Sequence, residues 1–390
     1  MKGFRGFGTR SHHWNGPPLA WRNIIRAKAR LIVAVAAISF SVVLIFMQLG
    51  LLTAVLKAAV LLYDSLNFDI ALVSPKSPEL LSPQPFPRQR LYQAAGIDGV
   101  AAVMPIYITF REWRNPETRK LRSILLVGFD PGDNAFRLSD VDRQRALLRQ
   151  QDVVLMSSLS RPEFGPRTIG LKTELNEREV KIGGLVEVSN TIRSDGTVIL
   201  STENFLRYAE GARADDVYLG LITLAPDQNV DAIVERLRQI LPDDVNVLSR
   251  QQVNRRDQRF WIASSSMGLI VGVACVTAFV VGSVVVYQIL NADVSEHLPE
   301  YATLKAMGYS NRRLAKVVLQ QSIILAILGF IPAAVLGFGM YRLIFIATRL
   351  PITMTVGRLG FVFLLTLIMC SASGMLALRK LFATDPAEIF

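Results

Sequence analysis

The chain has 390 residues, of which 51% are hydrophobic, and a formal net charge of +11 at neutral pH. A mean hydropathy of +0.34 is too high for an ordinary soluble protein, and the length exceeds what one domain usually needs. The two cysteines, Cys275 and Cys370, fall in apolar segments, so a disulfide framework or thiolate metal site is excluded from the polar part. The three histidines are too few and too scattered for a metal cluster.

The first thirty residues are basic and contain no Asp or Glu. Trp21, Ile24 and Ile25 would share one face of an interfacial helix that leads into an apolar segment. That segment is too long for a secretory signal peptide, and no cleavage pattern follows it. Because basic residues beside a span mark the cytoplasmic side, we predict a cytoplasmic amino terminus.

Four long apolar segments predict four transmembrane helices. With their stalks, they are residues 31–63, 261–290, 317–346 and 359–381. None has a charged residue in its central turns, which argues against an ion-coupled carrier. The remaining segments alternate between the cytoplasm (1–30, 291–316 and 382–390) and the outside (64–260 and 347–358).

Glycines in the second and third spans can allow helices to approach closely, although routine membrane glycines are an equally good reading for any one of them. These glycines are Gly268, Gly272, Gly282, Gly329, Gly337 and Gly339.

The outer segment 64–260 contains two similar halves around an insertion. Its strand and helix patterns predict one β-α-β half before residue 115 and another after residue 212. Facing each other, the halves would form a split, ferredoxin-like module, and the insertion 115–212 reads as mostly β. The predicted fold class is an α+β membrane protein. It has four transmembrane helices and a large periplasmic α+β domain between the first two, made of a split β-α-β porter-like module and a β-rich insertion.

The polar segment 291–316 lies between the second and third spans and has the pattern of a short helix. Pro299 suits the first turn, Gly308 can end the helix, and Ser310 can cap a further helix that starts near Asn311. An apolar stripe repeats every three residues at Tyr301, Leu304 and Met307. The segment could receive force from a soluble partner, or it could be an amphipathic loop at the lipid head groups.

The sequence contains no recognised catalytic motif. The Walker pattern G-x-x-x-x-G-K-[ST], G-x-S-x-G and H-E-x-x-H are all missing. We therefore predict a non-catalytic membrane protein that obtains its energy from another chain.

Three stretches resemble the MacB/FtsX-like ABC permeases, also called type VII transporters or mechanotransmitters. They are LAWRNIIRAKARLIVAVAAISFSVVLIFMQLG near the start, EYATLKAMGYSNRRL from Glu300, and the tail DPAEIF. FMQLG together with YQILNADVSEHLPEYATLKAMGYSN is similar to the DevC branch, the permease of cyanobacterial DevBCA-type exporters.

The resemblance implies a homodimer in the inner membrane of a bacterium, more narrowly a cyanobacterium, with both termini in the cytoplasm. A separate DevA-like ABC ATPase would bind ATP and magnesium, so this chain would need no cofactor of its own. A periplasmic DevB-like membrane-fusion protein and a TolC-like outer-membrane protein would complete a tripartite pump. The lipid membrane is also a partner, and nucleic acid is not. ATPase movement would drive the periplasmic domain to expel substrate, with glycolipid as the associated class.

The resemblance also implies where the ATPase binds. The contact residues would be Glu300, Tyr301, Leu304, Lys305, Met307 and Gly308. The tail supplies a second set, Asp385, Pro386 and Glu388. Alternatively, Leu304 and Met307 pack only against helices of their own chain.

Two other functions remain open within the same fold. A lipoprotein-releasing permease would present the outer domain to a periplasmic carrier, and an FtsX-like signalling protein would activate a periplasmic cell-wall hydrolase. A membrane-bound enzyme is disfavoured, because nucleophile and metal motifs are missing.

Overall fold

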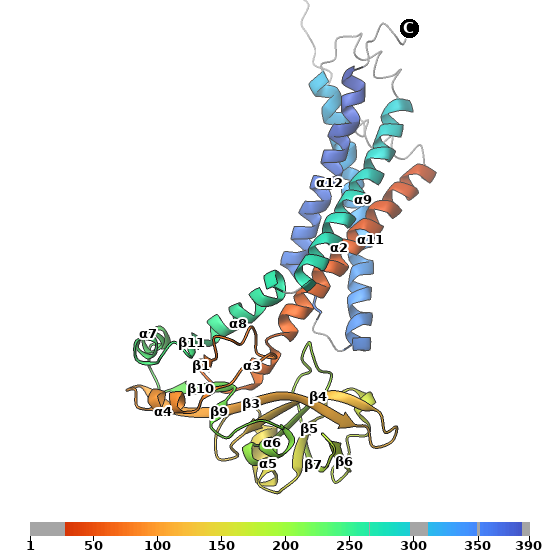
Figure 1. Ribbon diagram of the computed structural model, residues 1–390. Helices are drawn as coiled ribbons and strands as arrows, with labels where there is room; N and C mark the ends of the chain where they lie inside the picture. The colour runs from red at the N-terminus through yellow and green to blue at the C-terminus, as the bar shows by residue number, and fades with distance from the viewer. Residues whose placement is uncertain (1–27, 265, 297–310, 349–351, 384–390) are drawn as a thin grey trace, which may run out of the picture. The chain divides into compact units, whose positions relative to one another are not determined.

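A computed structural model describes most of the chain (Figure 1). The described residues are 28–264, 266–296, 311–348 and 352–383. They fall into two compact units. The helical unit comprises the described residues of Met1–Leu51 and Val271–Phe390, and the α+β unit is Leu52–Ile270.

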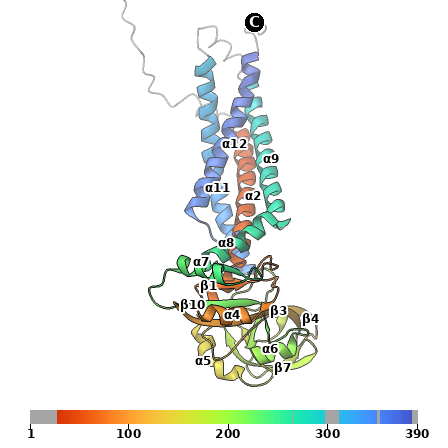
Figure 2. The same cartoon turned by 60° about the vertical axis from the view of Figure 1, so that its left-hand side comes forward.

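Four long helices run side by side in the helical unit (Figure 2). They are α2 (Lys28–Ala58), α9 (Ser266–Glu296), α11 (Asn311–Thr348) and α12 (Val356–Ala383). Each contains a stretch long and apolar enough to cross a membrane. The structure therefore confirms the four predicted transmembrane helices. The third begins at Asn311, where the sequence places its start.

The first predicted helix is interrupted a few residues inside the α+β unit, which begins at Leu52. The pattern extends one helix from 31 to 63, whereas α2 ends at Ala58 and a turn separates it from α3 (Leu61–Ser65). Leu62 and Tyr63 of α3 are buried in the core of the α+β unit. Burying these side chains favours a change of direction over continuing the helix.

The second span is also preceded by an interruption. Helix α8 (Arg250–Arg259) is followed by a π-helical turn, η2 (Phe260–Ser264), and α9 then starts at Ser266. Ser249 caps α8 by accepting from the Gln252 N–H, and the Gln252 side chain accepts in return from the Ser249 N–H. The apolar pattern predicts that this span starts at Trp261, and it does not predict α8.

The two predicted β-α-β halves pair as a ferredoxin-like module. The first half is β1 (Ile70–Val73), α4 (Gln89–Ala95) and β3 (Val100–Arg114). The second half is β10 (Leu219–Leu224), α7 (Val230–Ile240) and β11 (Asn246–Ser249). The strand order is β11-β1-β10-β3, and every pair is antiparallel. The predicted split module is confirmed.

The insertion continues the same sheet beyond β3. Its strands are β4 (Leu121–Phe129), β5 (Val153–Ser157), β6 (Lys172–Leu175), β7 (Arg178–Val186) and β8 (Thr197–Ser201). The order is β3-β4-β8-β5-β7-β6, and β6 pairs back to β3, so six strands form a closed ring. Helices α5 (Ser139–Leu148) and α6 (Thr202–Tyr208) also lie in the insertion, together with the short η1 (Pro162–Phe164). A separate small ladder pairs β2 (Phe86–Pro87) with β9 (Asp216–Val217).

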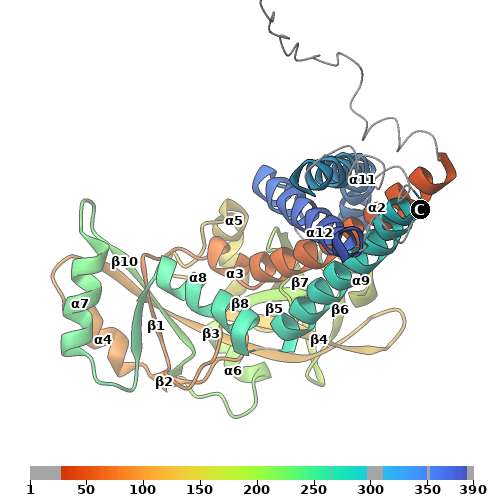
Figure 3. The ribbon, with the colours of Figure 1, turned by 90° about the horizontal axis from the view of Figure 1, so that it is seen from above.

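The α+β unit has two hydrophobic cores, on opposite faces of the sheet. Alternate residues of β1 show the division: Ile70 and Leu72 join one core, and Ala71 and Val73 join the other. Helices α4 and α7 cover the first core, whereas α3 and α8 cover the second. Helix α8 packs on β1 and β11 (Figure 3). The helix before α9 is thereby anchored to the ferredoxin-like module.

The seam that closes the ring depends on Trp113. Its side chain is fully buried, and its Nε1 donates to the Phe164 carbonyl oxygen at 3.0 Å.

We expect Trp113→Ala to lower the free energy of unfolding of the α+β unit by about 3–5 kcal/mol, because it leaves a cavity and an unpaired carbonyl. Hydrogen exchange at the β3 and β6 amides in the full-length protein would measure it. The control Tyr92→Ala, at a side chain that is 61% exposed, should cost less than about 1 kcal/mol. Equal protection in both variants would contradict this assignment.

Candidate coupling site

The predicted ATPase-binding segment joins α9 to α11. Helix α9 ends at Glu296 and α11 begins at Asn311. The predicted contact residues of this segment, Glu300, Tyr301, Leu304, Lys305, Met307 and Gly308, lie outside the described residues. The predicted tail residues Asp385, Pro386 and Glu388 follow the end of α12 and also lie outside them. The structure thus describes the helices that hold both segments, and the contacts themselves stay predictions.

The order of the helices places these segments on one side of a membrane. If the chain crosses the membrane with α2, α9, α11 and α12 in turn, three of its parts lie on the same side. These parts are the start of α2, the α9–α11 connection and the end of α12. A single partner on that side could therefore reach both predicted contact segments.

Small residues allow the helices of the helical unit to pack closely. A Cβ on Gly329 would lie 2.4 Å from Ile38 Cγ2, and one on Gly282 would lie 2.8 Å from Ser41 Cβ. Real side chains do not approach so closely, so these two positions of α11 and α9 need glycine where they meet α2. Among the other expected positions, a Cβ on Gly337 would lie 3.3 Å from Phe46 Cδ2, whereas a Cβ on Gly272 or Gly339 would meet open space. A Cβ on Gly268 would clash with the backbone carbonyl oxygen of Ile262, in the turn that precedes α9.

Hydrogen bonds between helices accompany these contacts. Ser39 Oγ of α2 donates to the Gly329 carbonyl oxygen at 2.8 Å, and Tyr341 of α11 donates to the Phe46 carbonyl oxygen. Ser373 Oγ of α12 donates to the Ser283 carbonyl oxygen of α9 at 2.8 Å. In an apolar surrounding each bond fixes two helices relative to each other. A displacement of α9 or α11 would therefore be shared with its neighbours.

The N-terminal end of α9 is preceded in the chain by α8, which contributes to a buried polar cluster in the α+β unit. We call it the Asp257 cluster: Tyr63, Leu80, Arg256 and Asp257. The Asp257 carboxylate of α8 is completely buried. Its Oδ2 accepts from the Tyr63 hydroxyl and from the Leu80 N–H, both at 3.0 Å. Its Oδ1 accepts from Arg256 Nε at 3.1 Å. Three separate chain segments, α3, the stretch after β1 and α8, meet at one carboxylate.

Burial raises the pKa of the Asp257 carboxyl above its ordinary value, and the Arg256 guanidinium and the hydrogen bonds counteract this effect. Burial, followed by the charge of Asp257, also raises the pKa of the Tyr63 hydroxyl well above its usual range. Tyr63 therefore stays a neutral donor to this carboxyl at physiological pH.

A second side chain of α8, Arg250, fastens the helix to the end of α3. Its guanidinium donates to the carbonyl oxygens of Tyr63 at 3.0 Å and of Phe68 at 3.2 Å, and also to that of Leu66. Its Cζ lies 4.2 Å from the centre of the Phe68 ring, which adds a cation–π contact. Together with the Asp257 cluster, this arginine joins the segment that follows α2 to the segment that precedes α9.

These residues were not predicted from the sequence, because their partners are far apart in the chain. Tyr63 and Asp257 are separated by 194 residues, and no local pattern pairs them. The only signal available in the sequence was the run of arginines in α8, just before an apolar span.

Comparison with known families gives two matches that together cover most of the chain. Residues 31–240 match the model of the MacB-like periplasmic core domain. Residues 269–386 match the model of the FtsX-like permease C-terminal domain. The first match takes in α2 and most of the α+β unit, and the second takes in α9, α11 and α12.

The individual relatives span almost the whole chain but share a low sequence identity with it. An uncharacterized ABC transporter permease of Mycobacterium bovis is 25% identical over 382 residues, which are 95% of this chain and 98% of that one. Another, of Mycobacterium tuberculosis, is 22% identical over 375 residues, with the same coverage. Among solved structures, the periplasmic region of MacB from Actinobacillus actinomycetemcomitans is 12% identical with a TM-score of 0.36, covering 50% of this chain and 94% of that one. The extracellular domain of the transporter YknZ from Gram-positive bacteria is 15% identical with a TM-score of 0.33, covering 47% of this chain and all of that one.

We expect Asp257→Ala to lower the free energy of unfolding of the α+β unit by about 3–5 kcal/mol. The substitution leaves a buried hydroxyl, a buried N–H and an arginine without their common acceptor. Tyr63→Phe, which removes one donor and keeps the carboxylate, should cost about 1 kcal/mol. Thermal unfolding of the purified full-length protein in detergent would rank the variants. If Asp257→Ala proved no more destabilising than Tyr63→Phe, the carboxylate would not be the centre of the cluster.

Proposed function

The chain belongs to the family of the MacB-like periplasmic core domain and is an ABC transporter permease of the MacB/FtsX type; from this we propose that it transmits ATPase movement to the α+β unit to expel a substrate. The observation that carries the proposal is the order of the two family domains. A MacB-like core domain lies between the first two of four apolar helices, and an FtsX-like permease domain follows.

We assign the input of movement to the segment between α9 and α11. An ABC permease works with an ATPase, and the helix predicted at Glu300–Gly308 is suited to contact it. Leu304 and Met307 would fill an apolar groove of the ATPase, while Glu300 and Lys305 would set the register. Tyr301 continues the apolar stripe, and Gly308 ends the helix. Asp385, Pro386 and Glu388 of the tail would form a second, smaller contact on the same side.

The path of transmission runs along α9. This helix is about 45 Å long at 1.5 Å per residue, and it is covalently continuous with η2 and α8. The Asp257 cluster and Arg250 join α8 to α3 and to the stretch after β1, and α8 also packs on β1 and β11. A push on α9 would therefore reach the ferredoxin-like module through hydrogen bonds that are already in place.

The rest of the assembly follows from the resemblance to the DevC branch. We propose a homodimer in a bacterial inner membrane, with both termini and the coupling segment in the cytoplasm and the α+β unit in the periplasm. A membrane-fusion protein would dock on that unit and lead to a TolC-like outer-membrane protein. The proposed substrate is an amphiphile of the glycolipid class, and the proposed source is a cyanobacterium.

An affinity purification from mild detergent, followed by mass spectrometry of all co-purifying proteins, tests this assembly. We expect an ABC ATPase together with a membrane-fusion protein. An ATPase with a lipoprotein carrier would indicate a lipoprotein-releasing permease. An ATPase with a cell-wall hydrolase would indicate an FtsX-like signalling protein. Either result would overturn the proposed exporter function, and the assignment as a permease would stand.

We expect Leu304→Asp to weaken the contact with the ATPase by more than about tenfold, because a carboxylate would enter an apolar groove. Stimulation of ATP hydrolysis in the reconstituted complex, measured as phosphate release, should fall to the level of the ATPase alone. The control Ile169→Asp, at a side chain of the α+β unit that is 63% exposed, should leave stimulation unchanged. Full stimulation by the Leu304 variant would show that this helix is not the contact.

A further inference from the structure

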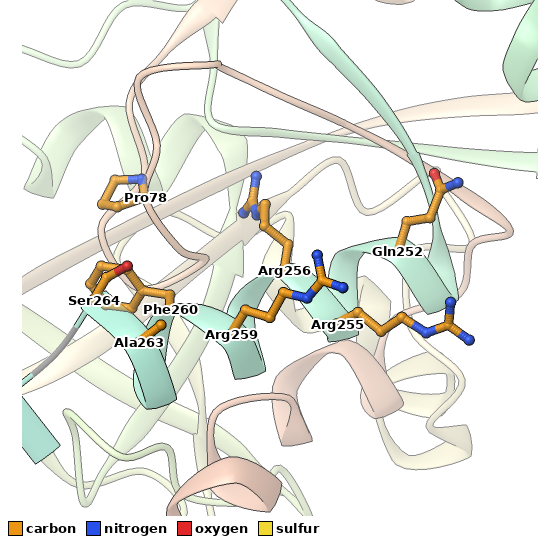
Figure 4. Close-up of a pocket in the computed structure, with 8 residues that line it drawn as sticks. All are labelled: Pro78, Gln252, Arg255, Arg256, Arg259, Phe260, Ala263 and Ser264. Atoms are coloured by element: carbon orange, nitrogen blue, oxygen red, sulfur yellow. The ribbon is translucent and has the colours of Figure 1, made fainter. Parts of the chain in front are cut away.

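The α+β unit contains a pocket of about 680 Å³ beside the start of the second span. It is lined by Pro78, Gln252, Arg255, Arg256, Arg259, Phe260, Ala263 and Ser264. In Figure 4 the three arginines come from α8, Pro78 comes from the stretch after β1, and the last three residues come from η2. We call it the arginine pocket.

The arginine pocket carries three arginines, and the described residues pair only one of them, Arg256, with a carboxylate. None of its eight lining residues is acidic. Arg255 and Arg259 make no hydrogen bond or ion pair with any residue that the structure describes. Arg256 directs Nε and Nη2 to Asp257 Oδ1, both at 3.1 Å, while its Nη1 is buried without a hydrogen-bond partner among the described residues. Asp257 thus holds one guanidinium in place and leaves donors of all three arginines available to an anion.

One end of the arginine pocket is apolar and leads into the membrane span. Phe260 lines it and packs edge-on against Trp261, with ring centres 5.9 Å apart. The span begins at Ser266, two residues after the lining residue Ser264. Tryptophan beside a span commonly lies at the level of the lipid head groups. By its place in the chain, the pocket therefore lies at the membrane surface.

The location of these arginines runs against the usual charge bias of membrane proteins. They flank the end of α9 opposite to the α9–α11 connection, within eleven residues of Ser266. Under the proposed orientation this is the periplasmic side, where short flanks generally carry fewer basic residues. An anion bound on that side would account for their presence.

We propose that the arginine pocket binds the phosphate of an anionic lipid head group in the leaflet next to the α+β unit. Guanidinium groups suit phosphate oxygens because they donate two parallel hydrogen bonds. The apolar end formed by Phe260 and Ala263 would accommodate the glycerol and upper acyl region. Free phosphate shares the anionic chemistry but cannot use that end. The inference requires α9 to be a membrane span and does not depend on the exporter function.

The test uses the full-length protein in nanodiscs of phosphatidylcholine, to which phosphatidylglycerol is added in increasing proportion. Bound phosphatidylglycerol is counted by native mass spectrometry after release from the nanodisc. Arg255→Gln/Arg259→Gln removes two unpaired arginines and keeps the Arg256–Asp257 pair, so the variant should fold. The matched control is Arg178→Gln/Arg236→Gln, which removes the same charge from exposed positions of the α+β unit.

We expect the pocket variant to weaken phosphatidylglycerol binding about tenfold, whereas the control retains it. Equal retention in both variants, or an equal loss in both, would overturn the proposal, since the pocket would then have no specific part in binding. Inorganic phosphate is the second probe. If it displaced the lipid at concentrations similar to those of phosphatidylglycerol itself, the site would be one for a free anion, and the lipid assignment would be wrong.

Discussion

A buried carboxylate, Asp257, is the point on which the connection between the sheet and the second span depends. Charges are rarely buried unless donors surround them, and here a tyrosine hydroxyl, a backbone N–H and a guanidinium do so. Two of the donors come from other chain segments, α3 and the stretch after β1, so satisfying the carboxylate requires both segments to be in place beside α8. This requirement specifies the geometry of the junction more narrowly than apolar packing alone would.

Different interactions stabilise the two units that α9 connects. In the helical unit, contacts rely on the absence of side chains, as at Gly282 and Gly329, and on single hydrogen bonds to backbone carbonyls. Within a membrane there is little hydrophobic force between helices, so close approach and polar contacts hold them together. In the α+β unit the sheet has apolar cores on both faces. The helical unit is thus held by close backbone approach and single hydrogen bonds, and the α+β unit is held by two apolar cores.

Most of the fold was predictable from the sequence, because apolar length and strand periodicity are local signals. The four spans, the two β-α-β halves and the β-rich character of the insertion were predicted in this way. The closure of the ring was not, since pairing Trp113 with Leu175 depends on contacts that no local pattern encodes. The turn after Ala58 was missed because the helical pattern of 61–65 continues in phase, and only burial of Leu62 and Tyr63 reveals the break. The coupling residues came from a resemblance and from an apolar stripe, and they lie outside the described residues, so the geometry of that contact stays a prediction.

Inside the α+β unit, both segments that lead to the long helices contain an interruption of regular helix: the turn at 59–60 after α2, and η2 before α9. Regular α-helices resist torsion because each turn is bonded to the next, and a loosened turn gives a local swivel. The sheet is therefore not joined to α2 or α9 by one unbroken helix. How firmly the two are joined depends on the side-chain contacts of α8, above all the Asp257 cluster and Arg250.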